Sequence, residues 1–415
     1  MILMGAVSLL SSVLLFVFSI PVVTHYRILP IVGTPYWLFG LLFLFLILHL
    51  VLSFNNLYGK VRHLLFWLIL IIVFGGTTVT AIVDRSKTAP VYGVHDIILQ
   101  QEAAMRYLLE GKNPYKETYF GTPVASFHYD EGGKPAVNPA LYHFVMPPWY
   151  LLFPFGFYFT STPLLGYFDG RMPLIALTFA LFFLISRWFK NRSIGELAIV
   201  LLALSPATLD YFIEGRSDVF ALFWLVWALY LLDKKHAFWS GVIYGLALMS
   251  KQTIWFSLPF YFMYVWLTTK NKKIFFINIG SVFATIAVII GPFFLWDPKA
   301  NLDSNVLYLS AGGLGGYPVA GYGWGMVLLA LGVIKDVHAQ HPFILWQIGF
   351  GLPTLFVILR FLKKRLFMSS IWFGYAIFLF VIWYFSRYFN NSHLGYVSSL
   401  FILAACFLLD EQKSI

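Results

Sequence analysis

Long apolar runs, separated by short charged segments, constrain this chain more than any other feature of its sequence. The first run covers Ile2–Val23 and the last covers Leu394–Leu409. A helix needs about 20 apolar residues to cross a bilayer, where only helices and closed barrels satisfy every backbone polar group. Hydrophobic residues make up 60% of the 415 residues and charged residues 11%, against about 25% charged residues in soluble domains. We therefore expect an all-α polytopic integral membrane protein with a single transmembrane domain, 1–415.

About twelve transmembrane helices are expected from these runs. Three of them, between 219 and 267, offer only about 14 or 15 apolar residues, fewer than a full crossing usually needs. The predicted spans are Ile2–Val23, Trp37–Phe54, Leu64–Val83, Pro173–Phe189, Ile194–Phe212, Val219–Leu232, Ala237–Ser250, Ile254–Leu267, Ile274–Leu295, Phe343–Leu362, Leu366–Phe385 and Leu394–Leu409.

The basic residues indicate how these spans are oriented. Lys and Arg cluster in the short connections at one end of the spans, and such clusters mark the cytoplasmic side of a membrane. Both termini are then predicted to be cytoplasmic in a plasma-membrane protein, and the polar segment that opens at Asp84 to be extracytoplasmic. Leu151–Phe159 is predicted to be a short interfacial or re-entrant helix, because a full crossing there would move every later cluster outside. The clusters are Lys60/Arg62, Arg187/Lys190/Arg192, Lys234/Lys235, Lys270/Lys272/Lys273 and Arg360/Lys363/Lys364/Arg365.

Two long segments are expected outside the membrane, the first outer loop (84–172) and the glycine-rich second outer loop (296–342). In the first, apolar residues recur at helical spacing over Ile97–Glu110, which predicts an amphipathic helix in the membrane interface. Glu102 and Arg106 have i,i+4 spacing and are predicted to form a surface pair. The second lacks the Gly-Lys-Ser/Thr of a nucleotide-binding loop. A mobile lid and close helix packing remain two interpretations of its glycines.

Composition also disfavours several classes of function. The net charge of +10 comes from the orientation clusters rather than from a basic surface with interleaved aromatics, so no nucleic-acid partner is expected. The single cysteine, Cys406, lies in an apolar run, which excludes a disulfide within the chain. His338 and His341 have no evident third ligand, so no metal and no other cofactor is expected.

Three segments, taken in order, resemble one enzyme family. The first outer loop contains Asp96, Ala103-Ala104 and Leu109-Glu-Gly-Lys-Asn-Pro-Tyr115 before a Pro-Pro helix. A Glu214-Gly-Arg-Ser-Asp218 turn then precedes a span, and Gly241-Val-Ile-Tyr-Gly-Leu-Ala-Leu-Met-Ser-Lys251 follows it. Together they resemble the GT-C glycosyltransferases, and most of all glycosyltransferase family 87 and related polyprenyl-phosphate-mannose-dependent mannosyltransferases. The loop follows the third span here instead of the first, and the Asp-x-Asp pair of many members is missing.

The resemblance implies a GT-C-like fold and an inverting transfer of a hexose, with mannose expected. The donor would be a polyprenyl-phosphate sugar, and the acceptor a hydroxyl of a lipid or glycan at the outer face. Asp96 would be the general base that takes the proton of the acceptor. The donor phosphate is expected at Lys251, Arg387 and His393, and the sugar or acceptor at Glu214, Arg216, Asp218, His95 and Tyr115.

Simpler interpretations stand beside these roles. Asp96 is also suited to cap the helix that follows it, Lys251 to reach from an apolar helix to the interface, and Asp218 to cap the span beginning at Val219. For the whole chain, the alternatives are a flippase or transporter of lipid-linked sugars, a non-catalytic membrane scaffold, and a polymerase or ligase of lipid-linked glycans with a diphosphate donor.

Overall fold

The computed structural model describes residues 2–29, 35–54, 58–131, 133–308, 310, 312–313 and 315–412. The chain is 73% helical with almost no sheet. The main helices are α1 Ile2–His25, α2 Tyr36–Phe54, α3 Gly59–Leu70, α4 Gly76–Ser86, α5 Asp96–Leu109, α6 Pro148–Leu152, α7 Phe155–Leu165, α8 Arg171–Trp188, α9 Arg192–Leu204, α10 Leu209–Ile213, α11 Asp218–Asp233, α12 Ala237–Leu248, α13 Leu258–Thr269, α14 Lys272–Trp296, α15 Pro298–Leu302, α16 Trp324–Ala330, α17 Phe343–Lys364, α18 Met368–Tyr384 and α19 Asn391–Glu411.

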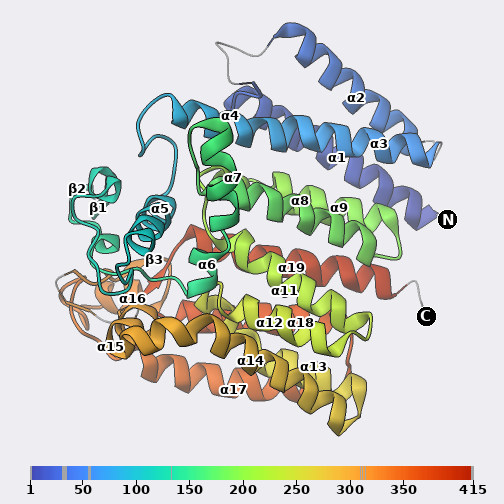
Figure 1. Cartoon of the computed structure of the whole chain (residues 1–415). Coiled ribbons are helices and arrows are strands. Elements are labelled where there is room, and N and C mark those ends of the chain that lie inside the picture. The colour runs from blue at the N-terminus through green and yellow to red at the C-terminus, as the bar shows by residue number, and fades with distance from the viewer. Residues whose placement is uncertain are drawn as a thin grey trace.

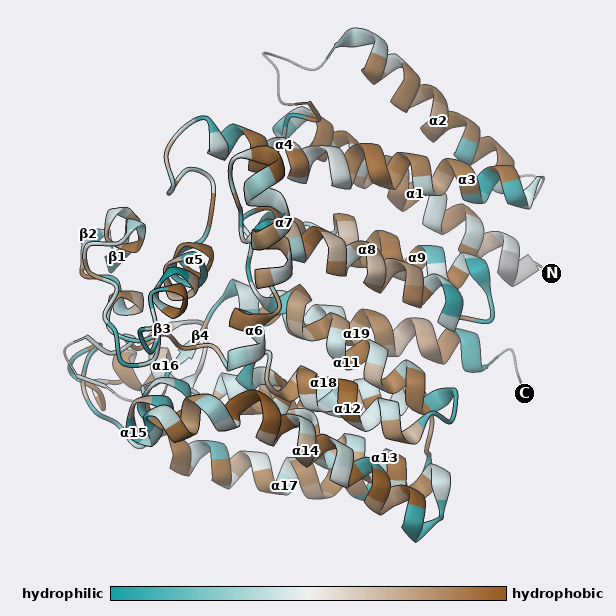
Figure 2. Ribbon diagram, viewed as in Figure 1, coloured by the Kyte–Doolittle hydropathy of each residue, from teal (hydrophilic) through white to brown (hydrophobic). Residues whose placement is uncertain are grey.

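The membrane character expected from the sequence is visible in the helices. Within the described residues, seven helices are long and apolar enough to cross a membrane, and two shorter apolar helices accompany them. Figure 2 shows apolar residues along the bundle and polar residues at its two ends. The seven are Gly5–His25, Tyr36–Phe54, Gly59–Ser86, Arg171–Trp188, Lys272–Trp296, Phe343–Lys364 and Asn391–Glu411.

Prolines interrupt two predicted helices. The predicted span Ile194–Phe212 is wrong in its second half, since α9 ends at Leu204 and the separate helix α10 begins at Leu209. Ser205 is extended because it precedes Pro206, and a proline disfavours helical backbone in the residue before it. Pro154 likewise separates α6 from α7, where the sequence predicted one helix, Leu151–Phe159.

The helix Gly59–Ser86 contains an irregular turn in its middle. Residues Ile71–Gly75 form a π-helical turn between α3 and α4, which accommodates one extra residue. Gly76 follows directly, and a Cβ atom there would lie 2.7 Å from the Ile28 side chain. The turn therefore brings α4 close to the chain that leaves α1.

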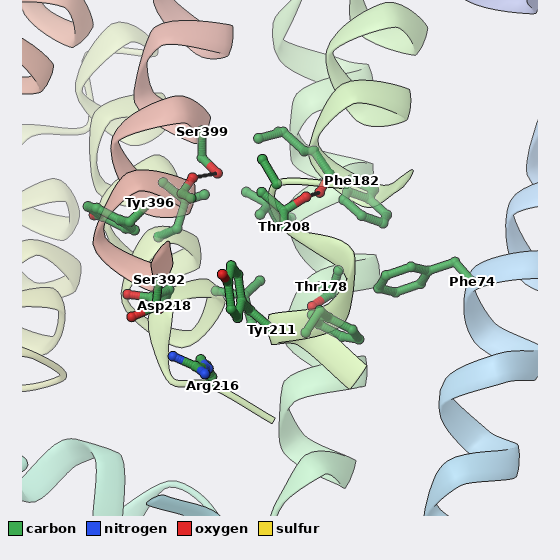
Figure 3. Close-up of a pocket in the computed structure, with 17 residues that line it drawn as sticks. Phe74, Thr178, Phe182, Thr208, Tyr211, Arg216, Asp218, Ser392, Tyr396 and Ser399 are labelled. Carbon is green, nitrogen blue, oxygen red and sulfur yellow. Dashed lines mark hydrogen bonds between the residues drawn. The ribbon is translucent and has the colours of Figure 1, made fainter. Parts of the chain in front are cut away.

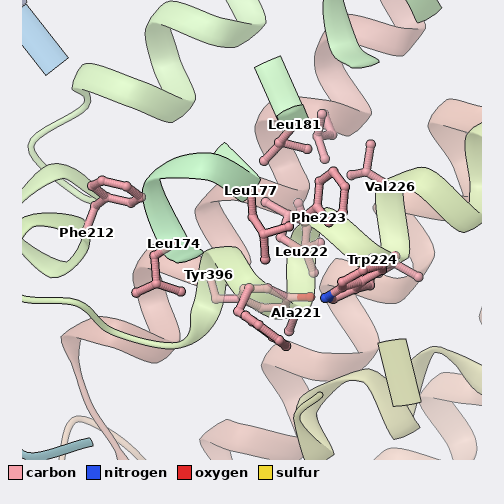
Figure 4. Close-up of a cluster of buried hydrophobic side chains, with 14 of the residues drawn as sticks. Leu174, Leu177, Leu181, Phe212, Ala221, Leu222, Phe223, Trp224, Val226 and Tyr396 are labelled. Atoms are coloured by element: carbon pink, nitrogen blue, oxygen red, sulfur yellow. The ribbon is translucent and has the colours of Figure 1, made fainter. Parts of the chain in front are cut away.

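The core lies where α8, α11 and α19 pack together. Figure 4 shows Leu177 and Leu181 of α8 against Leu222 and Phe223 of α11, with Tyr396 of α19 nearby. All five side chains are buried. This packing holds the N-terminal ends of α8, α11 and α19 in fixed relative positions.

Both outer loops gather at one end of the bundle, and the two ends of the chain lie at the other (Figure 1). The first outer loop forms α5 and the hairpin of β1 (Asp130–Glu131) and β2 (Lys134–Pro135). In the second outer loop, β3 (Ala320–Gly321) pairs in parallel with β4 (Tyr388–Phe389), just before α19. The loop is thereby attached to the turn between α18 and α19.

A buried ionic network fixes α5 to the ends of α4 and α8. Arg85 donates to both Glu102 carboxylate oxygens, at 2.7 and 2.8 Å, and contacts Asp169 at 2.9 Å. Arg171 donates to Asp169 at 2.8 Å. The predicted surface pair of Glu102 with Arg106 is therefore wrong. Glu102 faces inward, where burial favours a fully paired carboxylate, and Arg106 is exposed.

Candidate functional site

Helix α5 begins at the residue that the sequence singled out. His95 occupies the N-cap and Asp96 is the first helical residue, so Asp96 is not the cap. The Asp96 carboxylate has two partners, His95 Nδ1 at 2.7 Å and the amide of Asn138 at 2.9 Å. Its side chain is 16% exposed. The carboxylate is therefore held in place and only partly exposed.

The surroundings of Asp96 keep it ionised. Burial alone would raise the pKa of Asp96, but interaction with His95, the hydrogen bond from Asn138 and the positive charge of Arg216 together bring it below the ordinary aspartate value. The effect of Arg216 also means that these two side chains lie within electrostatic reach of each other, although 120 positions separate them in the sequence.

The turn from Glu214 to Asp218 is docked directly against the start of α5. The His95 backbone N–H donates to the Glu214 carbonyl at 2.8 Å. Gly215 has a φ of +88°, and a Cβ atom there would lie 2.6 Å from Ile98 and 2.8 Å from Arg171. Only glycine allows both this backbone conformation and this approach. The contact places Asp96 beside the charged residues of the turn.

The positive charges of Arg216 and Lys251 differ in how fully they are paired. The Lys251 ammonium lies 2.5 Å from Asp218, which neutralises it. Arg216 lies over the Tyr211 ring at 4.5 Å and makes one contact of 3.3 Å through Nε with Glu214. Among the described residues, none is hydrogen-bonded to the terminal nitrogens of Arg216. Arg216 is thus better placed than Lys251 to meet an anion.

His393 lies at the start of α19, close to the same charges. It forms a reciprocal cap with Asn390, and its ring is 4.4 Å from that of Trp383. Lys251, Asp218 and Arg216 all act on it electrostatically. The structure therefore brings together His393, Lys251, Asp218 and Arg216, which the sequence analysis named separately.

Arg387 and Tyr115 have structural partners instead. Arg387 is 3% exposed and donates to the carbonyls of Tyr317, Val337 and Ala339, so it fixes the second outer loop. The Tyr115 hydroxyl donates to Met146 at 2.8 Å, and its ring packs on Phe144. The predicted ligand roles of both residues stay untested, but these contacts leave their side chains little freedom to bind a phosphate or a sugar.

Three tyrosines near Asp96 were missed by the sequence analysis. After burial, which is the largest cause, the negative charge of Asp96 helps to raise the pKa of Tyr129, Tyr317 and Tyr388. The rings of Tyr317 and Tyr388 are 5.9 Å apart, and all three side chains are half-buried. They come from both outer loops and from β4, so no local sequence signal connects them.

An apolar groove leads away from Arg216 into the bundle. Its volume, including space open to solvent, is about 560 Å³, and it is lined by residues of the π-helical turn, α8, α9, α10, α11 and α19. Figure 3 shows Arg216 at its lower end, Tyr211 above it, and Thr208 and Phe182 further along. Asp218 and Ser392 add polar atoms near the Arg216 end. The groove is apolar along its length and charged at one end.

Within the part of the chain that the structure describes, no group of three His, Cys, Asp or Glu side chains is arranged to hold a metal ion. Comparison with protein-family models and with curated proteins gives no match.

Proposed function

We propose that this protein is an inverting glycosyltransferase. It moves a hexose, which we expect to be mannose, from a polyprenyl-phosphate donor to a hydroxyl of a lipid or glycan acceptor. One observation carries the proposal: an apolar groove ends at a cation, Arg216, and a fixed carboxylate, Asp96, lies within electrostatic reach of that cation. A lipid-linked phosphate sugar needs an apolar channel, an anion ligand and a nearby acid–base group.

The donor fits this arrangement with its aliphatic chain in the groove and its phosphate at the charged end. Its aliphatic chain occupies the groove, where apolar side chains replace lipid, and its phosphate meets Arg216. Arg216 stabilises the charge that develops on the departing phosphate, and the Lys251–Asp218 pair and His393 lie beside it. Glu214 and Asp218 then contribute acceptors for sugar hydroxyls. No metal is required in this scheme.

The reaction is a single displacement. The acceptor hydroxyl attacks the anomeric carbon, the bond from that carbon to the phosphate oxygen breaks, and the phosphate leaves with the electron pair. Removal of the acceptor proton depends on Asp96, which is ionised and held in place by His95 and Asn138. Attack opposite the leaving group inverts the anomeric centre.

The GT-C-like architecture is part of the proposal. Twelve crossings result if α9, α11, α12, α13 and α18 cross together with the seven longer helices. At 1.5 Å per residue, these five span roughly 18 to 26 Å, short of the hydrocarbon thickness of ~30 Å. The proposal therefore includes local thinning of the bilayer or tilted neighbours around them. It also places both termini in the cytoplasm and the outer loops outside the plasma membrane.

The test measures transfer of radiolabelled sugar from polyprenyl-phosphate-mannose, and from its glucose and arabinose analogues, into a membrane lipid extract. We expect wild-type protein to transfer from one donor and Asp96→Asn to lose roughly 10²- to 10⁴-fold in rate. Asp130→Asn is the matched control, since Asp130 is in the same loop with a side chain 48% exposed. No transfer by wild-type protein from any donor would refute the proposal and favour a diphosphate donor, a flippase or a scaffold.

A further inference from the structure

The start of α5 raises the question of which atom receives the proton of the acceptor. Two oxygens of Asp96 are present, and each already has a donor: Oδ1 faces His95 Nδ1 at 2.7 Å, and Oδ2 accepts from Asn138 at 2.9 Å. A carboxylate that is doubly hydrogen-bonded and has a lowered pKa is a weak base. The same contacts make it well suited to orient a neighbouring group.

The contact between His95 and Asp96 determines the tautomer of the imidazole. Nδ1 also lies 3.4 Å from the Ile97 backbone N–H, which would need Nδ1 as an acceptor. The 2.7 Å contact with a carboxylate oxygen is much shorter, and two acceptors do not approach that closely without a proton between them. We assign the proton to Nδ1 on the basis of this shorter distance, which leaves the lone pair of the neutral ring on Nε2.

The far side of the His95 ring is open. Its side chain is 28% exposed, and among the described residues no group is hydrogen-bonded to Nε2. The backbone N–H of His95 is fixed by the Glu214 carbonyl, so the residue cannot drift away from the turn that holds Arg216. A fixed imidazole with one nitrogen on a carboxylate and the other unpaired is the arrangement of a general base with its orienting acid.

We propose that His95, through Nε2, is the catalytic base of the transfer, and that Asp96 is a positioning residue that holds its ring and stabilises the imidazolium. The inference rests on the proposed function. The acceptor O–H proton moves to Nε2 as the acceptor oxygen bonds to the anomeric carbon and the phosphate leaves with its electron pair. Nδ1 keeps its own proton, and the imidazolium then releases the transferred proton to water.

The titratable and charged groups around this pair come from four segments of the chain. Asp96 is on α5 itself, Glu214 and Arg216 are on the turn between α10 and α11, and Tyr129 approaches Asp96 from the first outer loop. Arg171 of α8 binds the Gly93 carbonyl just before His95. Of these groups, Asp96 makes the direct contact with the ring.

The decisive variant is His95→Asn. The Asn amide nitrogen occupies nearly the position of Nδ1, so it still donates to Asp96, and Asn is a good N-cap residue. It has no atom at the position of Nε2. If His95 is the base, kcat falls at least ~100-fold with little change in donor KM. The control is His128→Asn in the same loop, where the side chain is 81% exposed, and it should retain wild-type rates.

The pH profile of kcat/KM is a second readout, and it would not change in the variants if His95 had only a structural role. With His95 as base, wild-type kcat/KM declines on acidification, because a protonated base cannot take the acceptor proton. That limb is absent in His95→Asn, and added imidazole restores part of the activity of His95→Ala. If instead His95→Asn keeps wild-type rates and profile, Asp96 is the base and the inference is overturned. If wild-type protein transfers nothing, the proposed function itself has failed.

Discussion

The ionic network behind α5 offers a prediction that does not depend on the proposed function. Arg85 is 7% exposed, contacts both Glu102 and Asp169, and also donates to the Pro90 carbonyl at 2.6 Å. Arg85→Met keeps much of the apolar stem but removes the charge. Glu102 is then left with one donor, the Gly170 N–H at 3.0 Å, and Asp169 with Arg171.

The expected cost follows from the uncompensated charge. Removing one partner of a buried ion pair typically destabilises a protein by about 3–5 kcal/mol. Unfolding entropy scales as roughly 2.1 cal/mol/K per residue, so for a chain of this length Tm should fall by about 3 to 6 °C. The double variant Arg85→Met/Glu102→Gln removes the stranded charge as well, and we expect it to recover about 1–3 kcal/mol of the loss.

Thermal unfolding in one detergent, followed by intrinsic fluorescence, measures these differences. Arg106→Met is the matched control, since Arg106 is the exposed arginine that helical spacing alone would pair with Glu102. It should lie within about 0.5 kcal/mol of wild type. If Arg85→Met behaves like Arg106→Met, or if the double variant is no more stable than Arg85→Met, the network does not stabilise the fold as described.

Three further predictions test other contacts. Gly215→Ala should lower transfer at least tenfold, because its Cβ would push α5 away from the turn. Gly111→Ala is its control: Gly111 has a φ of +73° and open space around it, so this variant shows only the cost of the left-handed backbone, about 1–2 kcal/mol of stability. Arg387→Met should detach the second outer loop, so that limited proteolysis cuts within 312–341 sooner than in wild type. Burial raises the pKa of Asp169, but the charge and hydrogen bonds of Arg171 outweigh it, so its folded pKa lies below the unfolded 3.8. Its stabilisation is therefore present above pH 4 and lost on acidification below it, and Tm measured from pH 3 to 7 should decline less steeply in Asp169→Asn than in wild type.

The sequence was informative where one local rule determines the structure. Hydropathy located the helices because lipid accepts no unpaired backbone, and α5 differs from its predicted range by one residue at each end. The early end of α9 also had a signal, since Pro206 lies inside the apolar run and marks a break. Weighing that proline against hydropathy would have corrected the prediction.

Contacts between distant segments left no comparable signal. The i,i+4 rule paired Glu102 with Arg106, but burial brings Glu102 to Arg85, 17 positions earlier. Asp96 and Arg216 come together through a backbone hydrogen bond and the absent side chain of Gly215. Gly215 was the one clue, because a glycine in a short turn indicates a tight backbone approach but does not identify the partner.

The π-helical turn at Ile71–Gly75 has a consequence for how this chain tolerates changes in length. Each residue of an α-helix turns its successors by about 100° around the axis. The extra residue in this turn therefore sets the rotation of α4 relative to α3, and with it the directions of Phe74, which lines the groove, and Arg85, which holds α5. Deleting a single residue here would leave the hydropathy of the span intact while turning both side chains away from their partners. In this helix the number of residues, and not only their hydropathy, determines which way the side chains of α4 face.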